Sequence, residues 1–180
     1  MTSASKRHIL DIVTCSPEQT YMLGKEASRF VYGGLCIMLN GDLGSGKTTF
    51  VKGLVCGLDG DEAKSPSFNL VNEYAGRINV AHADLYRLKV TDGYDLGLYD
   101  YLNYGYLLIV EWCDRWICPP SSDVWCLSFG LFDVDVEEDF LPDLGNKRKI
   151  TFTCLGDKAC KSLAMYAESI DVEGAKKCLY

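Results

Sequence analysis

The chain has few of the residues that build metal centres, membrane spans or nucleic-acid surfaces. It has two histidines and no Cys-x-x-Cys pair among nine cysteines, which excludes the usual zinc ligand sets. No apolar run approaches the roughly 18 residues that a membrane-spanning helix requires. Lysine and arginine number 18 against 25 acidic residues, a formal net charge of −7. Because phosphate contacts need basic side chains, we expect any RNA to be held by a partner protein.

The remaining composition is typical of an ordinary globular domain, with 48% hydrophobic and 24% charged residues among 180. Several cysteines lie in apolar runs, where a thiol acts as a small hydrophobe: Cys36, Cys126 and Cys154. This usage predicts a reduced, cytoplasmic protein, and the N-terminus lacks the apolar core of a signal peptide. We expect one domain over residues 1–180, with a core over about 8–170 and frayed ends at 1–7 and 171–180.

Residues 41–48 have the pattern Gly-x-x-x-x-Gly-Lys-Thr of a phosphate-binding loop. The apolar residues 35–39 before it are of strand length, and residues 49–58 after it place their apolar side chains on one helix face. The glycines let backbone N–H groups surround phosphate oxygens, and the helix directs its positive end at the same anion. Lys47 is placed to reach the β- and γ-phosphates, and Thr48 to offer its hydroxyl to Mg²⁺. The segment therefore predicts binding of a nucleoside triphosphate.

Strand and helix patterns alternate around this loop and predict an α/β fold. Strands are expected at 8–14, 35–39, 68–74, 77–86, 106–110, 124–132 and 150–154, and helices at 17–31, 49–58, 92–103 and 157–169. The unbroken apolar residues 106–110 predict a central strand covered on both faces. Residues 133–143 carry six acids and no base, and are interpreted as a solvated loop. We predict a single P-loop NTPase-like domain whose mixed central β-sheet is flanked by helices.

Two acidic residues follow predicted strands. Glu111 ends the apolar strand, where P-loop proteins place a carboxylate for the metal; alternatively it only terminates the strand. Asp84 ends the preceding strand and can orient or deprotonate the attacking water; alternatively it caps a turn or forms a salt bridge. His82 shares a strand face with Asp84, and a structural and a catalytic role both stay open.

Other polar residues near these segments have two interpretations each. Ser65 and Ser67 bracket Pro66 and either sense a γ-phosphate or form a turn. Trp112 is either a core residue or a reporter near the site. No arginine finger is assigned, and each candidate is equally a surface residue: Arg87, Arg115 and Arg148.

Four blocks of sequence together resemble the TsaE (YjeE) family of small bacterial ATPases. The blocks are residues 39–50, 65–74, 82–87 and 109–112, in the family's order and at similar spacings over roughly 16–155. The resemblance implies a part in making N6-threonylcarbamoyladenosine at position 37 of tRNAs that read codons beginning with A. It implies TsaB- and TsaD-like partners that perform the transfer, only indirect contact with tRNA, and ATP hydrolysis that is weak without those partners.

The resemblance also implies roles for individual residues. The phosphates of ATP are bound by the loop and the helix start: Leu43, Gly44, Ser45, Gly46, Lys47, Thr48 and Thr49. Thr48 and Glu111 hold Mg²⁺, and hydrolysis requires Asp84 together with Lys47 and Glu111. Further nucleotide contacts are implied around Glu18 and Lys147. The chain departs from the family pattern at Ser67, Ala83, Cys113 and residues 91–94, and none of these departures removes a phosphate or metal ligand.

Two other functions compete with an ATPase. A P-loop small-molecule or nucleotide kinase usually carries an arginine-rich lid, and the sequence has no arginine cluster. A GTPase-like switch carries Asn-Lys-x-Asp, whereas Asn146-Lys147 is followed here by Arg148 and Lys149. The sequence therefore favours a Mg²⁺-dependent ATPase, with the kinase as the alternative.

Overall fold

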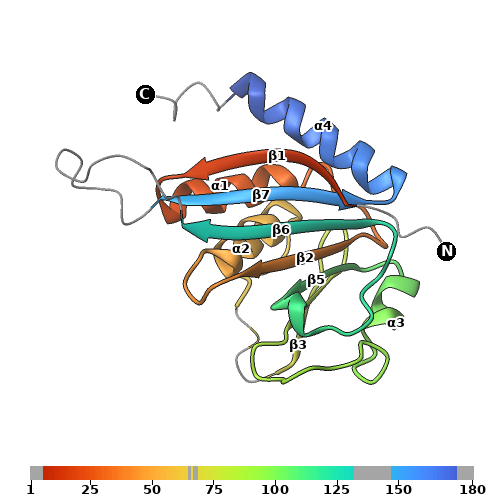
Figure 1. Ribbon diagram of the computed structural model, residues 1–180. Helices are drawn as coiled ribbons and strands as arrows, with labels where there is room; N and C mark the ends of the chain where they lie inside the picture. The colour runs from red at the N-terminus through yellow and green to blue at the C-terminus, as the bar shows by residue number, and fades with distance from the viewer. Residues whose placement is uncertain (1–5, 65, 67–68, 132–146, 174–180) are drawn as a thin grey trace.

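The computed structural model describes residues 6–64, 66, 69–131 and 147–173. A seven-stranded mixed sheet forms its centre, in the order β1–β7–β6–β2–β5–β4–β3 (Figure 1). The strands are β1 (Arg7–Thr14), β2 (Cys36–Gly41), β3 (Val71–Tyr74), β4 (Val80–Asp84), β5 (Leu107–Glu111), β6 (Val124–Leu131) and β7 (Arg148–Leu155). The helices are α1 (Pro17–Ala27), α2 (Lys47–Gly57), α3 (Leu98–Asn103) and α4 (Asp157–Glu173), with a 3₁₀ turn at Cys113–Arg115. The predicted mixed sheet with flanking helices is confirmed.

The four central strands β4, β5, β2 and β6 run parallel, whereas β3, β7 and β1 are antiparallel to their neighbours. Every residue of β5 is buried, as its apolar sequence predicts. Parallel strands end at the same edge of a sheet, so Asp84 at the end of β4 pairs with Glu111 at the end of β5. Gly41 ends β2 at this edge and leads into the glycine-rich loop. The topology thus gathers the predicted site residues.

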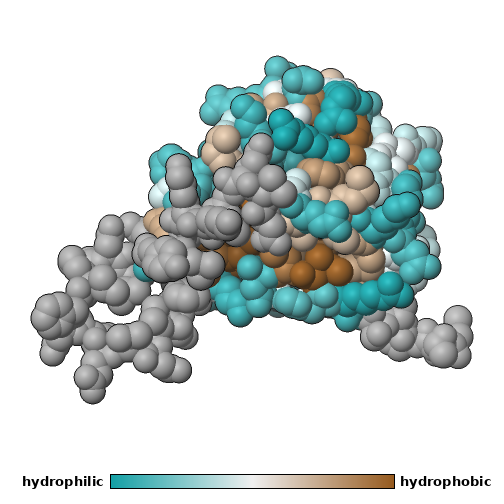
Figure 2. Space-filling model, turned by 90° about the horizontal axis from the view of Figure 1, so that it is seen from above, coloured by the Kyte–Doolittle hydropathy of each residue, from teal (hydrophilic) through white to brown (hydrophobic). Residues whose placement is uncertain are grey.

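Apolar side chains cover both faces of the sheet. One core combines α1, α2 and α4 with residues of β1, β7, β6 and β2, including the fully buried Trp125, Tyr166, Phe50 and Phe152. The other combines α3 and the segment around Trp116 with β4, β5 and β2. Figure 1 shows α1 and α2 side by side on one face and α4 along the β1 side. Figure 2 looks onto that side, where apolar surface lies between hydrophilic margins.

Several elements are shorter than their sequence patterns predict. α1 ends at Ala27 rather than near Val31, because the next three N–H groups bond to carbonyls three residues back and turn the chain. α3 starts only at Leu98, after Gly97 with a φ of 66°. β3 starts at Val71. The acidic residues 133–143 lie outside the described residues, and so do residues 1–5 and 174–180 of the ends predicted to fray at 1–7 and 171–180. Within those predicted ends, Arg7 already belongs to β1 and α4 continues to Glu173.

The expectation of a fully reduced chain is wrong at one cysteine pair. Cys154, at the end of β7, forms a disulfide with Cys160 in the first turn of α4. Gly156 adopts a φ of 87°, which lets α4 begin directly after β7 and brings the two Cα atoms to 5.2 Å. Cys154 therefore contributes a covalent link between strand and helix. Within the described ranges, no helix has the length and apolar character needed to cross a membrane.

Candidate functional site

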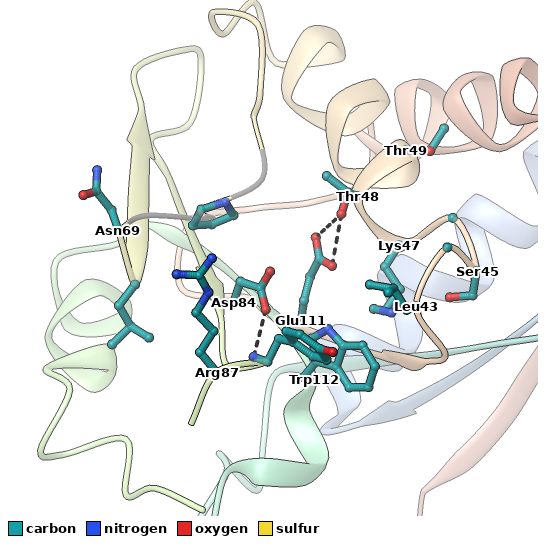
Figure 3. Close-up of a pocket in the computed structure, with 15 residues that line it drawn as sticks. Leu43, Ser45, Lys47, Thr48, Thr49, Asn69, Asp84, Arg87, Glu111 and Trp112 are labelled. Atoms are coloured by element: carbon teal, nitrogen blue, oxygen red, sulfur yellow. Dashed lines mark hydrogen bonds between the residues drawn. The ribbon is translucent and has the colours of Figure 1, made fainter. Parts of the chain in front are cut away.

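A cavity of about 540 Å³ opens where the parallel strands end. Its wall combines the glycine-rich loop, the start of α2, the ends of β4 and β5, and the segment before β3. The lining residues are Leu43, Gly44, Ser45, Gly46, Lys47, Thr48, Thr49, Pro66, Asn69, Leu70, Asp84, Tyr86, Arg87, Glu111 and Trp112. Figure 3 shows the Thr48 and Glu111 side chains meeting in this cavity, with Asp84 beside Arg87. The predicted loop and the two predicted carboxylates therefore share one cavity.

The loop backbone has the conformation that a phosphate cradle requires. Gly44 and Gly46 have φ values of 76° and 105°, which disfavour any side chain. At Gly41, a Cβ would lie 2.4 Å from the carbonyl oxygen of Phe129. The buried Ser45 Oγ has no hydrogen-bond partner among the described residues, so it is a donor without an acceptor. These features fit the phosphate groups of a nucleotide.

Lys47 adds a positive charge to the floor of the cradle. Its Nζ donates to the carbonyl oxygens of Gly41 at 2.7 Å and Asp42 at 2.9 Å. The same ammonium lies 4.3 Å from the centre of the Trp112 ring. Burial lowers the pKa of Lys47, and the nearby carboxylates of Glu111 and Asp84 oppose that shift. The side chain is well placed to meet anionic oxygens that enter the cavity.

Thr48 and Glu111 form a pair of oxygen ligands. The Thr48 hydroxyl donates to Glu111 Oε1 at 2.8 Å and approaches Oε2 at 3.1 Å. Among the described residues, no three His, Cys, Asp or Glu side chains gather as a metal-binding group. One hydroxyl and one carboxylate fit Mg²⁺, which takes few protein ligands and completes its shell with water and phosphate oxygens. The pair does not fit a cation that needs an all-protein cage.

His82 and Asp84 lie on β4 beside this pair. His82 is fully buried, and its Nε2 lies 3.0 Å from Glu111 Oε1. Asp84 lines the cavity, and its Oδ1 accepts the backbone N–H of Tyr86 at 2.9 Å. Asp84 therefore has both features considered from the sequence, a turn-capping hydrogen bond and a position in the site.

A family model described as threonylcarbamoyl adenosine biosynthesis protein TsaE matches residues 14–130. The chain belongs to the TsaE family. The matched residues include the glycine-rich loop, Asp84 and Glu111, and exclude Lys147. The family resemblance carried by the four sequence blocks is confirmed.

Individual TsaE relatives extend the match. A tRNA threonylcarbamoyladenosine biosynthesis protein TsaE from Aquifex aeolicus is 35% identical over 144 residues, which cover 78% of this chain and 92% of the relative. The Bacillus subtilis protein of the same name is 39% identical over 101 residues, 55% of this chain and 63% of that protein. A crystal structure of Bacillus subtilis YdiB has a TM-score of 0.69 at 26% identity, covering 92% of this chain and 97% of the other.

Two nucleotide contacts implied by the TsaE resemblance lie away from the cavity lining. Glu18 is exposed in the first turn of α1, where its own backbone N–H and Ser16 lower the pKa of its carboxyl. Lys147 directly precedes β7. Neither residue lines the cavity, and their contacts with nucleotide stay predictions. Ser65 and Ser67 lie outside the described residues, so their two interpretations also stay open.

The three candidate arginines have different surroundings. Arg87 lines the cavity. Arg115 donates to the carbonyl oxygens of Leu85 and Leu88, at 3.3 and 2.8 Å, and lies against Trp112. Arg148 lies on β7. The geometry thus favours Arg87 as the arginine nearest to a bound nucleotide.

The sequence patterns gave no role to three further lining residues: Asn69, Leu70 and Tyr86. Each lies inside a block that carries the TsaE resemblance. Their side chains have no fixed place in the phosphate-loop pattern, so only membership of those blocks could have indicated them. Tyr86 packs 4.9 Å from the Trp112 ring, which links the end of β4 to the end of β5.

Proposed function

We propose that this TsaE-family chain is a Mg²⁺-dependent ATPase. Its ATP hydrolysis would support formation of N6-threonylcarbamoyladenosine at position 37 of tRNAs that read codons beginning with A. The observation that carries the proposal is the contact of Thr48 with Glu111 beside a phosphate cradle, in one 540 Å³ cavity. The relatives' names support the tRNA process.

The lining residues divide the work of hydrolysis. Backbone N–H groups of residues 43–48 bind the phosphates, and Lys47 balances charge on the β- and γ-phosphates. Thr48 and Glu111 would hold Mg²⁺, which neutralises charge on phosphate oxygens when bound. Asp84 orients the attacking water or accepts its proton. Arg87 is the candidate for stabilising charge that develops on the transferred group.

The partners in this proposal are TsaB- and TsaD-like proteins. They perform the transfer and hold the tRNA, and the chain alone hydrolyses ATP slowly. Nucleotide-dependent changes of shape transmit the state of the cavity to the partners. The family assignment and the acidic net charge of −7 support this division, because an acidic chain is a poor tRNA binder by itself.

The experiment compares Lys47→Ala with Lys52→Ala, an exposed lysine on the same helix. Hydrolysis of ATP is measured for the chain alone and mixed with TsaB- and TsaD-like proteins. We expect Lys47→Ala to lose at least about 100-fold in rate, as when a single charge-stabilising donor is removed. Lys52→Ala is expected to match the unmodified chain.

Two results would contradict the proposal. One is a Lys47→Ala chain that still hydrolyses ATP and restores the tRNA modification in cells depleted of the protein. The other is labelled phosphate appearing on a metabolite rather than as free phosphate, which would support the kinase alternative.

A further inference from the structure

We propose that His82 is a positioning residue, whose Nε2–H holds the Glu111 carboxylate in the orientation that receives Mg²⁺ together with Thr48. The inference rests on the proposed function of the cavity and adds a residue that does not line it. His82 acts through Glu111 and makes no contact of its own with ATP or metal.

The hydrogen bonds at Glu111 fix the direction of each donor. An ionised carboxylate only accepts, so the 3.0 Å contact with His82 Nε2 is a donation from the ring. Oε1 of the same carboxylate accepts from Thr48 at 2.8 Å. Donors from β4 and α2 therefore converge on one oxygen of a residue at the end of β5. The glutamate side chain is 3% exposed and has little room to move.

The other ring nitrogen argues against a purely structural histidine. His82 Nδ1 is buried and has no hydrogen-bond partner among the described residues. A buried polar atom without a partner costs stability, which an apolar side chain of similar size would avoid. The ring packs 6.5 Å from Tyr74, whose hydroxyl bonds to the Lys64 backbone. Packing alone therefore gives no reason for an imidazole, and the bond from Nε2 to Glu111 does.

The consequence of losing this bond is specific to the metal. A glutamate side chain has three rotatable bonds, and fixing them costs conformational entropy. The hydrogen bonds from Thr48 and His82 fix the Glu111 side chain before the metal binds, so metal binding does not have to supply that cost. Removing the hydrogen-bond partner of a metal-ligating group typically lowers metal affinity by about 10–100-fold. We therefore expect His82 variants to require more Mg²⁺ while they still bind nucleotide through the loop.

The experiment uses three substitutions in the full chain. His82→Gln keeps a donor near the Nε2 position, His82→Asn moves it to the Nδ1 position, and His82→Leu removes it. Binding of a fluorescent ATP analogue is measured in EDTA and across a Mg²⁺ titration, with circular dichroism to verify folding. For His82→Leu and His82→Asn we expect an unchanged affinity for the ATP analogue in EDTA. The Mg²⁺ concentration that gives half of the metal-dependent change should rise about 10–100-fold. Gln is expected to stay within about 3-fold of the unmodified chain.

A double variant separates positioning from general damage. If His82 acts through Glu111, adding His82→Leu to Glu111→Gln should cause no further shift in the Mg²⁺ requirement, whereas independent effects would add. An unchanged Mg²⁺ curve in folded His82→Leu, or an equal loss of affinity in EDTA, would overturn the role of His82. An unmodified chain whose nucleotide binding ignores Mg²⁺ would overturn the proposed function and this inference with it.

Discussion

Glu111 shows how a single side chain can join separate parts of the molecule. It accepts hydrogen bonds from Thr48 and from His82, and it lies beside Asp84 through the pairing of β4 with β5. Glu111 ends β5, and its carboxylate contacts both the start of α2 and the neighbouring strand β4. A change at Glu111 is therefore expected to alter metal binding before it alters the fold.

Asp11 gives a prediction that concerns stability alone, because it lies on the edge strand β1. Hydrogen bonding from Thr151, with smaller contributions from His8 and Lys149, lowers the pKa of Asp11 from 3.8 to about 2. A lowered folded-state pKa stabilises the fold above the unfolded value, and this stability is lost as pH falls from about 4 to about 2. Asp11→Asn should lower the free energy of unfolding at pH 7 by less than about 1 kcal/mol, since the side chain is 40% exposed.

Urea unfolding of Asp11→Asn and the unmodified chain at about pH 7, 4 and 2.5 tests this prediction. The difference between the two chains should shrink steadily towards the lowest pH. A difference of the same size at every pH would mean that the substitution acts through packing, not through the charge.

Individual residues differ in how far the sequence could define them. Lys47, Thr48, Asp84 and Glu111 were predictable, because a phosphate-loop pattern and strand ends place them by local rules. The bond from His82 to Glu111 was not, since it depends on the register between β4 and β5. The register of two strands is set when segments that are far apart in the sequence pair, and a single sequence does not show which residues will face each other.

Helices α1 and α2 contact each other through glycine backbones. A Cβ on Gly53 would lie 1.9 Å from the Tyr21 carbonyl oxygen, and one on Gly24 would lie 2.0 Å from that of Phe50. Thr20 of α1 in turn lies 3.5 Å from where a Cβ on Gly46 would be. The close approach of the two helices therefore holds α1 against the phosphate loop.

Gly53→Ala tests this contact. Alanine favours an isolated helix by about 1 kcal/mol. Overpacking against a backbone carbonyl costs about 3 kcal/mol or more, the upper end of the usual range, so we expect net destabilisation of about 2 kcal/mol or more. Gly130→Ala is the control, because a Cβ there meets no atom within 4 Å, and its effect should stay within about 0.5 kcal/mol. Chemical unfolding measures both. A Gly53→Ala chain with a higher free energy of unfolding than the unmodified chain would contradict the prediction, because it would mean that α1 and α2 can move apart without loss of stability.

Elements were easier to predict than their arrangement. The apolar face of α2 follows from its periodicity and the buried strand β5 from an unbroken apolar run, and both are confirmed. The strand order places β7 and β6, late in the sequence, between β1 and β2. Local patterns contain no information about such neighbours. The disulfide from Cys154 to Cys160 was missed for a related reason, because only the turn at Gly156 brings the two cysteines together.

The charge of the whole molecule limits what it can bind alone. The chain has seven more acidic than basic residues, and its lysines and arginines include Lys47 inside the cavity. Binding to a tRNA backbone gains most of its free energy from cations released by lysine and arginine contacts, and it weakens steeply with salt. An acidic chain gains little from this effect.

We therefore expect no measurable binding of labelled tRNA by the chain alone at about 50 mM salt, where electrostatic attraction is strong. With TsaB- and TsaD-like proteins and ATP present, fluorescence anisotropy should report a complex. In this mixture, a chain with Lys47→Ala is expected to leave the anisotropy of the labelled tRNA unchanged when it is added. A chain with Lys52→Ala is expected to change the anisotropy as the unmodified chain does. Salt-sensitive binding of tRNA by the isolated chain would contradict the prediction, because it would require a basic surface on a chain whose net charge is −7. The tRNA would then be a direct ligand of this chain, and the proposal that partner proteins hold the tRNA would be wrong.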